Sequence, residues 1–225
     1  MNLAVVLAGG TGSRMGADRP KQFLQLEGRM VIEHAVDTFC QASQIDEVAV
    51  VVHPDWLDFM GEVASRNAWP KLSRIIPGGS ERYMSSLNAL NAYAAAPPDT
   101  NILFHDAARP WVSLQIIERV CHALLKSQAV CVGIPSTDTV WQVDPATHVV
   151  AAVPDRTTMF RAQTPQSFRL TVIAEAYRRA LRDPHFCATD DCGVLHRYCP
   201  EIPIQVVMGS EQNKKITFPE DLQSL

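Results

Sequence analysis

The sequence lacks any apolar run long enough to cross a bilayer. Its longest apolar stretches, Leu3–Ala8 and Val48–Val52, are far shorter than the roughly 20 residues that a membrane-spanning helix requires. The N-terminus has no basic residue before its apolar stretch and reaches Gly9 and Gly10 early, which is not the pattern of a secretory signal. We therefore expect a cytoplasmic protein with no membrane partner.

Two further signals are missing. The six cysteines include no C-x-x-C pair, so the sequence indicates neither a zinc site nor a disulfide framework, and we interpret most of them as small core residues. There is also no excess of positive charge. The formal net charge is -4, which argues against nucleic-acid binding in general and leaves any basic site to be local.

The 225 residues are 47% hydrophobic and 20% charged, enough for one full core and incompatible with a disordered chain. We expect a single domain, residues 1–225. Apolar, β-branched runs alternate with segments of helical period. The continuous apolar runs indicate strands covered on both faces, and hence an α/β, doubly wound, mostly parallel sheet with helices on both faces. Strands are predicted at 3–7, 47–52, 74–76, 101–105, 130–134 and 204–208, and helices at 30–42, 54–68, 80–95, after Ser113, at 171–182, after 189–191 and at 219–222.

A β-hairpin interrupts this alternation. Thr139–Val143 and His148–Val153 flank the turn-forming Asp144-Pro-Ala-Thr147, which predicts two short antiparallel strands within about 138–155. A lone two-stranded ribbon is marginal in water and needs a surface to pack on. The hairpin either lies on its own domain or forms an arm around a second subunit.

A glycine-rich turn follows the first predicted strand. Leu7-Ala-Gly-Gly-Thr-Gly-Ser-Arg-Met-Gly16 places Gly9, Gly10 and Gly12 at the carboxyl end of a parallel strand, where α/β folds bind ligands. Glycines there let the backbone approach a phosphate or a base. It is not a dinucleotide fingerprint, because Met15 stands where the third glycine belongs, and not a P-loop, because Ala17 follows Gly16.

Charged residues accompany this turn. Arg14, Arg19 and Lys21 come directly after the glycines, and such a cluster at a strand end suits a triphosphate, although a solvated basic loop is the alternative. Asp106 ends another buried strand. A carboxylate in that position suits Mg²⁺, which prefers one or two carboxylates plus substrate phosphates; the alternative is a structural acid paired with Arg109.

The motifs, taken in order, resemble one family over essentially the whole chain. They are the glycine turn with Pro20-Lys21-Gln22-Phe23, Gly78-Gly79-Ser-Glu-Arg82 with Ser85, His105-Asp-Ala-Ala-Arg-Pro110, Asp138-Thr139, Asp155-Arg156, Gln163-Thr-Pro-Gln166, Thr189-Asp190-Asp191 and Asn213-Lys-Lys-Ile-Thr217. Together they look like the cytidylyltransferases of polyol phosphates, which act on 2-C-methyl-D-erythritol 4-phosphate or ribitol 5-phosphate. The resemblance implies a Rossmann-like nucleotidyltransferase fold.

The resemblance also implies a role for each matching residue. Catalytic cations would be Arg14, Lys21 and Lys215, with Lys214 adjacent and Lys215 preferred because it precedes Ile216-Thr217 as the family pattern does. The nucleotide CTP would be bound by Ala8, Gly9, Gly10, Gly12, Gly78, Gly79, Ser85 and Ala107. Asp106 would hold Mg²⁺. The acceptor would be bound by Asp106, Arg109, Thr139, Arg156, Thr164 and Thr189, and the hairpin arm would exchange between subunits of a homodimer.

The two acceptors are hard to separate. The glycine turn and Trp141 resemble the ribitol branch, whereas Thr189-Asp190-Asp191 and Thr217–Leu222 resemble the methylerythritol branch. One methyl group in a pocket contributes only about 1–3 kcal/mol of discrimination. We expect a methylerythritol phosphate enzyme of isoprenoid precursor synthesis, with CDP-ribitol formation for a wall polymer as the alternative. Another sugar-phosphate nucleotidyltransferase, or a non-catalytic nucleotide-binding protein, is a lesser alternative.

Overall fold

A seven-stranded sheet organises the computed structural model, which describes residues 1–10 and 19–222. Every strand of this sheet runs in the same direction except β10, which lies antiparallel between β6 and β7. The strand order is β11-β7-β10-β6-β1-β4-β5. The bounds are β1 Asn2–Ala8, β4 Glu47–Val52, β5 Leu72–Pro77, β6 Asn101–Asp106, β7 Ala129–Pro135, β10 Phe160–Arg169 and β11 Gln205–Met208.

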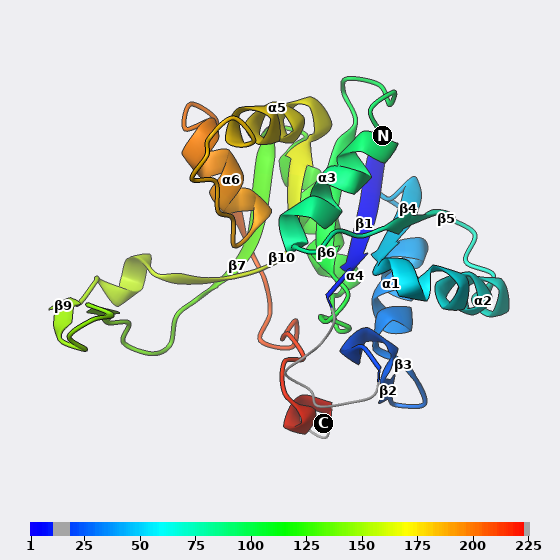
Figure 1. Cartoon of the computed structure of the whole chain (residues 1–225), viewed down its shortest axis with the longest axis horizontal. Coiled ribbons are helices and arrows are strands. Elements are labelled where there is room, and N and C mark those ends of the chain that lie inside the picture. Colours follow the sequence, from blue (N-terminus) through cyan, green and yellow to red (C-terminus); the bar gives the residue numbers. More distant parts are fainter. Residues whose placement is uncertain (11–18, 223–225) are drawn as a thin grey trace.

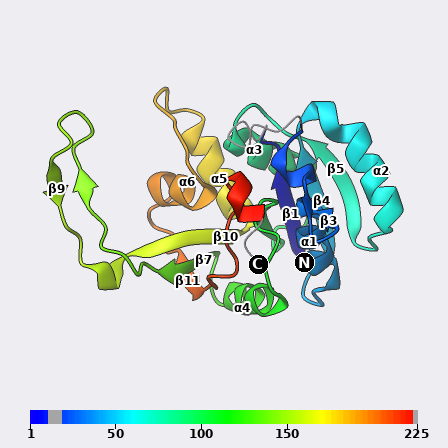
Figure 2. The same ribbon diagram turned by 90° about the horizontal axis from the view of Figure 1, so that it is seen from below.

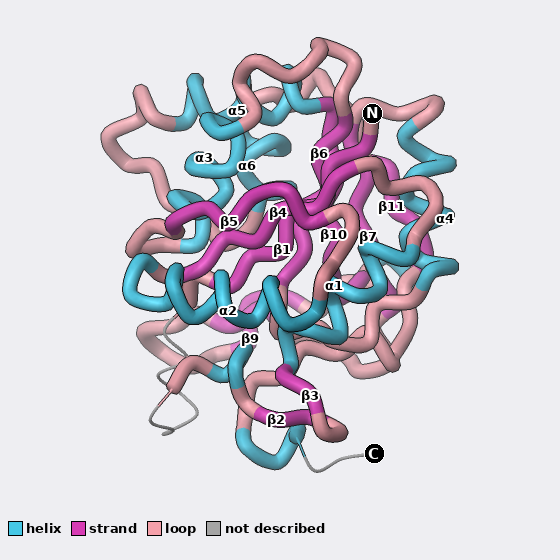
Figure 3. Tube along the Cα trace, turned by 90° about the vertical axis from the view of Figure 1, so that its right-hand side faces the viewer, coloured by secondary structure: helices cyan, strands magenta, loops and turns pink. Residues whose placement is uncertain are grey.

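Helices cover both faces of the sheet, as the sequence predicts (Figures 1 and 3). One core lies between the sheet and α1 (Val31–Gln41), α2 (Leu57–Asn67) and α4 (Leu114–Leu124). The other lies under α3 (Arg82–Ala92), α5 (Leu170–Ala180) and α6 (Asp191–Tyr198). Alternate residues of β1 enter the two cores, which is why its sequence is apolar without a break. In the part of the chain that the structure describes, no helix is both long and apolar enough to span a membrane.

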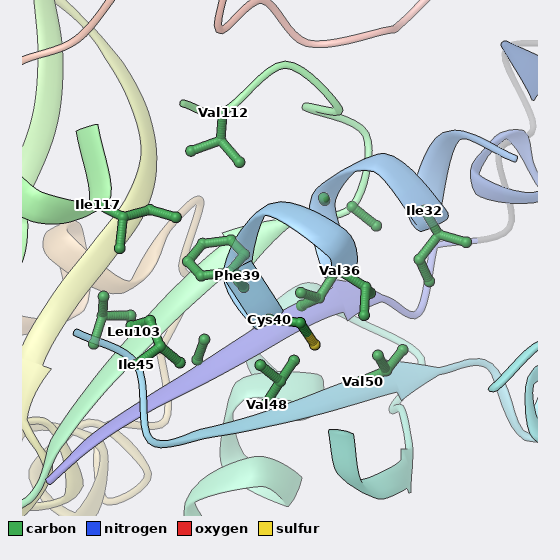
Figure 4. Close-up of a cluster of buried hydrophobic side chains, with 14 of the residues drawn as sticks. Ile32, Val36, Phe39, Cys40, Ile45, Val48, Val50, Leu103, Val112 and Ile117 are labelled. Carbon is green, nitrogen blue, oxygen red and sulfur yellow. The ribbon is translucent and has the colours of Figure 1, made fainter. Parts of the chain in front are cut away.

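The local signals in the sequence account for the packing. Ser113 caps α4 by accepting a hydrogen bond from the backbone N–H of Ile116 at 3.3 Å, and the apolar stripe of that helix is buried. Figure 4 shows Val36 and Phe39 of α1 packed with Leu103 and Ile117 in the first core. Burying a large apolar side chain of this kind contributes about 1.5–3 kcal/mol.

The predicted elements are confirmed within a few residues, but the sequence analysis did not identify β10. The predicted helix at 54–68 begins as a 3₁₀ turn, Pro54–Trp56. Four other short elements also lack a prediction: the 3₁₀ turns Lys21–Phe23 (η2) and Arg156–Thr158, and the paired strands β2 (Gln25–Leu26) and β3 (Arg29–Met30). The predicted C-terminal helix is a 3₁₀ turn at Pro219–Leu222.

The predicted hairpin is present and projects from the body as an arm (Figures 1 and 2). Its strands β8 (Gln142–Val143) and β9 (Val150–Ala152) pair in antiparallel fashion. The arm and its base carry exposed apolar side chains: Val140, Trp141, Val143, Val149, Val150, Val153 and Phe160. The side chain of Trp141 is 63% exposed. An apolar ribbon of this kind, extended away from its own core, is a surface suited to another protein.

His105 lies at the core of the fold with both ring nitrogens bonded. Its Nε2 is 3.0 Å from the carbonyl oxygen of Arg109, which can only accept, so Nε2 carries the proton. Nδ1 is then free to accept from the hydroxyl of Thr164 at 3.0 Å, and that hydroxyl accepts from the backbone N–H of Asp106 at 3.1 Å. The ring is fully buried and packs edge-on against Phe39. A neutral imidazole fits this chain of bonds.

We expect His105 to make the fold sensitive to acid. Burial lowers its pKa from 6.5 to about 4, even though the nearby Asp106 favours the charged form. Below pH 6.5 the unfolded chain therefore binds a proton that the native protein does not, and stability falls until about pH 4, by up to roughly 3 kcal/mol for a shift of this size. Urea unfolding of the wild type and of His105→Gln across this range tests the effect. The variant should show the shallower pH dependence, and equal slopes would contradict the prediction.

Candidate active site

A cavity of about 330 Å³ opens at the carboxyl ends of the central strands. From β1 the chain proceeds to β4 and β5 on one side, and then crosses to β6 on the other side of β1. The strand order thus reverses between β1 and β6, and such switch points leave a crevice where α/β proteins bind ligands. The cavity is lined by Leu7, Ala8, Gly9, Gly10, Lys21, Gln22, Gly79, Ser80, Glu81, Arg82, Ser85, Asp106, Ala107, Ala108, Lys215 and Thr217.

Two glycine turns meet in one wall of the cavity. A Cβ added to Gly9 would lie 2.7 Å from the hydroxyl oxygen of Ser85, and one added to Gly78 would lie 3.0 Å from the same atom. Ser85 is buried, and its Oγ accepts from the backbone N–H of Gly79 at 3.2 Å. These close approaches explain why the sequence has glycine at both positions. They also place Ala8, Gly9, Gly10, Gly79 and Ser85 around one space.

Gln22 fixes the first glycine turn, a role that the sequence analysis did not assign. It lies in η2, is buried, and donates through Nε2 to the carbonyl oxygens of Ala8 and Gly10 at 2.6 and 2.9 Å. One side-chain amide therefore holds both ends of the Ala8–Gly10 segment. In the sequence, the feature that could have indicated this role is the position of Gln22 next to Lys21. That this turn is buried becomes apparent only in the folded structure.

Asp106 is the carboxylate at the base of this site, and cations surround it. Its Oδ1 is 3.3 Å from Nε of Arg82, and its Oδ2 is 2.7 Å from Nζ of Lys215. Burial by itself disfavours the charged carboxylate, but the fields of Arg82, Lys215 and Arg109 outweigh it and hold the pKa of Asp106 well below its usual range. The site therefore keeps a fixed negative charge at neutral pH.

The structure distinguishes the two adjacent lysines. Lys215 lines the cavity and pairs with Asp106, whereas Nζ of Lys214 lies 5.3 Å from the centre of the Trp111 ring. Lys21 also lines the cavity, and its Nζ donates to the carbonyl oxygen of Ile216 at 2.8 Å. Residues from the two ends of the chain thus meet on one side of the cavity.

Two predicted acceptor residues lie beside Asp106 and outside the cavity lining. The hydroxyl of Thr164 is buried and bonds the backbone N–H of Asp106 and the ring of His105. Arg109 donates to the carbonyl oxygens of Asn213 and Ala162 at 2.8 and 3.3 Å. Both therefore support the end of β6 and the segment that carries Lys215.

Other predicted residues are not brought to the cavity within one chain. Thr139 and Arg156 are exposed on the arm, and Arg156 donates to the carbonyl oxygen of Thr137 at 3.1 Å. Thr189 is exposed just before α6. By contrast, Ala107 lines the cavity, and Gly78 lies against the lining residues Gly9 and Ser85. The predicted site residues Gly12 and Arg14 lie outside the described residues.

Arg82 is a second cavity residue to which the sequence analysis assigned no role. It begins α3, and its guanidinium bridges Asp106 of β6 and Asp191 of α6, with 2.6 Å between Nη1 and the Asp191 carboxylate. Burial lowers its pKa, but the two carboxylates outweigh that effect and raise it above its ordinary value. The sequence does contain Arg82 and Asp191 within motifs, but their contact spans 109 residues.

Comparison with known proteins agrees with this geometry. Residues 2–225 match the family described as 2-C-methyl-D-erythritol 4-phosphate cytidylyltransferase. The chain is 48% identical over 222 residues to the protein of that name from Thermobifida fusca, covering 97% of this chain and 89% of the relative. It is 36% identical over 221 residues to a Haemophilus influenzae bifunctional ribulose 5-phosphate reductase/CDP-ribitol pyrophosphorylase, covering 98% of this chain and 46% of that protein.

A solved structure shares the fold. The 4-diphosphocytidyl-2C-methyl-D-erythritol synthase of Anaerococcus prevotii superposes with a TM-score of 0.85 at 28% identity, covering 99% of this chain and 95% of that one. Its match extends over the whole described architecture, including the sheet that forms the cavity. The chain therefore belongs to the 2-C-methyl-D-erythritol 4-phosphate cytidylyltransferase family, as its motifs predict, and is a nucleotidyl-transferring enzyme.

Proposed function

We propose that the cavity binds CTP and that the enzyme transfers CMP from CTP to the phosphate of 2-C-methyl-D-erythritol 4-phosphate, with release of pyrophosphate. This reaction would belong to isoprenoid precursor synthesis. The observation that carries this proposal is the meeting of the glycine turns, Asp106, Lys21 and Lys215 around one cavity at the switch point of the sheet. The tight backbone wall at Gly9, Gly78 and Ser85 suits the flat cytosine. The lysines suit the phosphates.

The reaction needs charge neutralisation and alignment more than covalent help. A phosphate monoester oxygen is already anionic near neutral pH, so it attacks the α-phosphorus in line, and the bond to the leaving pyrophosphate breaks. Lys21 and Lys215 approach the same side of the cavity, where their charges would stabilise the crowded α-phosphate and the leaving group. Arg14 is proposed as a third cation.

Asp106 is the residue that fits a magnesium ion. Its carboxylate lines the cavity, stays ionised and lies beside the proposed phosphate subsite. Within residues 1–10 and 19–222 no cluster of three or more potential ligand side chains occurs, so the nucleotide phosphates would supply most of the other ligands, as Mg²⁺ commonly allows. Bound there, Mg²⁺ would neutralise phosphate charge.

The acceptor pocket is proposed to form between two subunits. Thr139 and Arg156 are predicted to bind the acceptor, yet they are exposed on an arm that projects from the body of the chain (Figure 2), and neither lines the cavity. A second copy offers the simplest occupant for the exposed apolar ribbon of the arm. Arg156 of one copy would then reach the other copy's site, where Arg109, Thr164 and Thr189 would complete the pocket.

We also propose a cytoplasmic location. All six cysteines are free thiols, four of them buried. Proteins of the reducing cytoplasm keep their thiols in this form.

Ribitol 5-phosphate is the competing acceptor, favoured by Trp141 and by the similarity to the Haemophilus influenzae protein. Pyrophosphate release should require CTP, Mg²⁺ and a polyol phosphate together, and should be faster with methylerythritol phosphate than with ribitol phosphate. A side-by-side turnover measurement with both acceptors and all four nucleoside triphosphates checks this. Faster turnover with ribitol phosphate would reverse the acceptor assignment, and a preference for UTP or GTP would reject CTP.

Loss of Lys21 or Lys215 should slow turnover more than it weakens substrate binding. Because these charges are needed most in the transition state, Lys21→Ala and Lys215→Ala should each lower kcat by about 10²–10³-fold, with smaller changes in KM. Lys214→Ala is the matched control, since Lys214 faces Trp111, and should stay within a few fold of wild type. Steady-state kinetics of the three variants measure this. A large loss of kcat in Lys214→Ala with a small loss in Lys215→Ala would assign the catalytic role to Lys214 instead.

The shared pocket predicts a specific complementation between two impaired variants, measured at an acceptor concentration near the wild-type KM. Arg156→Ala should chiefly raise the acceptor KM. A purified heterodimer of a Lys21→Ala chain with an Arg156→Ala chain would contain one intact site, and should regain about half of wild-type turnover per dimer. If Arg156 served its own subunit, neither site would be intact, and at an acceptor concentration near the wild-type KM only the low turnover of a raised-KM site would remain.

The oligomeric state of an arm deletion provides the independent check. Removal of residues 140–152 should yield monomers in analytical ultracentrifugation, with poor use of the acceptor. A deletion protein that remained dimeric would contradict the arm as the dimer contact.

A further inference from the structure

Arg82 links three elements through two carboxylates. Its Nη1 lies 2.6 Å from Oδ2 of Asp191 and its Nε lies 3.3 Å from Oδ1 of Asp106. The first contact joins α3 to α6, and the second joins α3 to the end of β6. The Arg82 side chain is 26% exposed, and it also lines the cavity.

The end of this bridge at Asp191 is held by several contacts. The Asp191 side chain is fully buried, its other oxygen accepts from the hydroxyl of Tyr177 at 2.6 Å, and its backbone N–H donates to Gln166 at 3.0 Å. A buried carboxylate without a counter-charge costs several kcal/mol, so Asp191 holds the guanidinium in place. A planar fork anchored at one corner has little freedom at the other.

The end at Asp106 is the functional one. Oδ2 of Asp106 faces Lys215, a cation proposed to stabilise the phosphates. Oδ1 faces Arg82, whose position is fixed from the opposite side by Asp191. When nucleotide phosphates compete with Asp106 for Lys215, the contact between Lys215 and Asp106 would weaken. The contact with Arg82 would then be the one that fixes the orientation of the Asp106 carboxylate.

We infer that Arg82 is a positioning residue: anchored on Asp191, it holds the Asp106 carboxylate in the orientation that the metal–nucleotide complex needs. The inference rests on the proposed role of Asp106. The bridge also reaches α6 two residues after Thr189, so it connects the nucleotide wall with a proposed acceptor residue.

A charge-balanced double variant separates positioning from simple stabilisation. Arg82→Met alone leaves Asp191 as an unpaired buried charge and should lower the melting temperature. Arg82→Met with Asp191→Asn removes both charges, and the new amide oxygen still accepts from Tyr177, so the melting temperature should recover. Turnover should remain reduced by about 10²-fold, the scale of losing one preorganised contact. Recovery of both stability and turnover would overturn the inference, because Arg82 would then serve only to neutralise Asp191.

A second measurement does not depend on activity. Calorimetric titration with CTP, with and without Mg²⁺, gives the factor by which the metal strengthens nucleotide binding. This factor should fall by about tenfold, or 1.4 kcal/mol, in the double variant. An unchanged factor would contradict the inference.

A double-mutant cycle with Asp106→Asn distinguishes the inference from the proposed function. If Arg82 acts through Asp106, adding the Arg82 and Asp191 changes to Asp106→Asn should cost little further turnover. If the losses of turnover caused by the two sets of changes multiplied, the positioning role of Arg82 would be overturned, but the proposed function would stand. Full turnover of Asp106→Asn by itself would instead overturn the proposed role of Asp106, and the inference with it.

Discussion

The negative charge of Asp106 is the interaction on which the site depends. It stands at the end of β6, a strand buried over its whole length, where an isolated carboxylate would lose its charge. Arg82 and Lys215 keep it ionised from opposite sides. The carboxylate in turn pairs with cations from α3 and from the C-terminal segment around one cavity, so the same pairings that stabilise the charge also form the proposed phosphate subsite.

Another part of the cavity wall is made of backbone. Gly9 and Gly78 approach so closely that a single extra carbon at either would press on Ser85. Gln22 holds the first turn from behind by bonding two of its carbonyl oxygens. Closely packed polar backbone and paired charges are the two features that a site for nucleotidyl transfer needs, because catalysis by alignment requires well-positioned groups.

The hairpin arm stands apart from the core of the fold. Its strands pair only with each other in the described chain, and its apolar side chains face solvent. The body forms the proposed nucleotide cavity by itself, whereas the predicted acceptor residues Thr139 and Arg156 lie on the arm. In the proposed dimer, nucleotide recognition would be a property of one subunit and acceptor recognition a property of the assembly. A second subunit would also give this marginal hairpin the surface that it needs to pack on.

The amino-acid sequence alone determined the alternation of strands and helices, the glycine turn at the end of β1 and the family, because periodicity, turn chemistry and motif order are local properties. It did not reveal β10, since the Gln163-Thr-Pro-Gln166 segment is polar and interrupts the ladder between Ala162 and Gln166. Nor did it assign Gln22 or Arg82. Only the tertiary structure decided the roles of Gln22 and Arg82 and distinguished Lys215 from Lys214, because each depends on contacts between residues distant in the chain. Arg82 contacts Asp191 across 109 positions, and Lys215 contacts Asp106 across the same number of positions. Hydrophobic patterning selects the fold, but the pairing of buried charges is settled only when the fold brings them within reach.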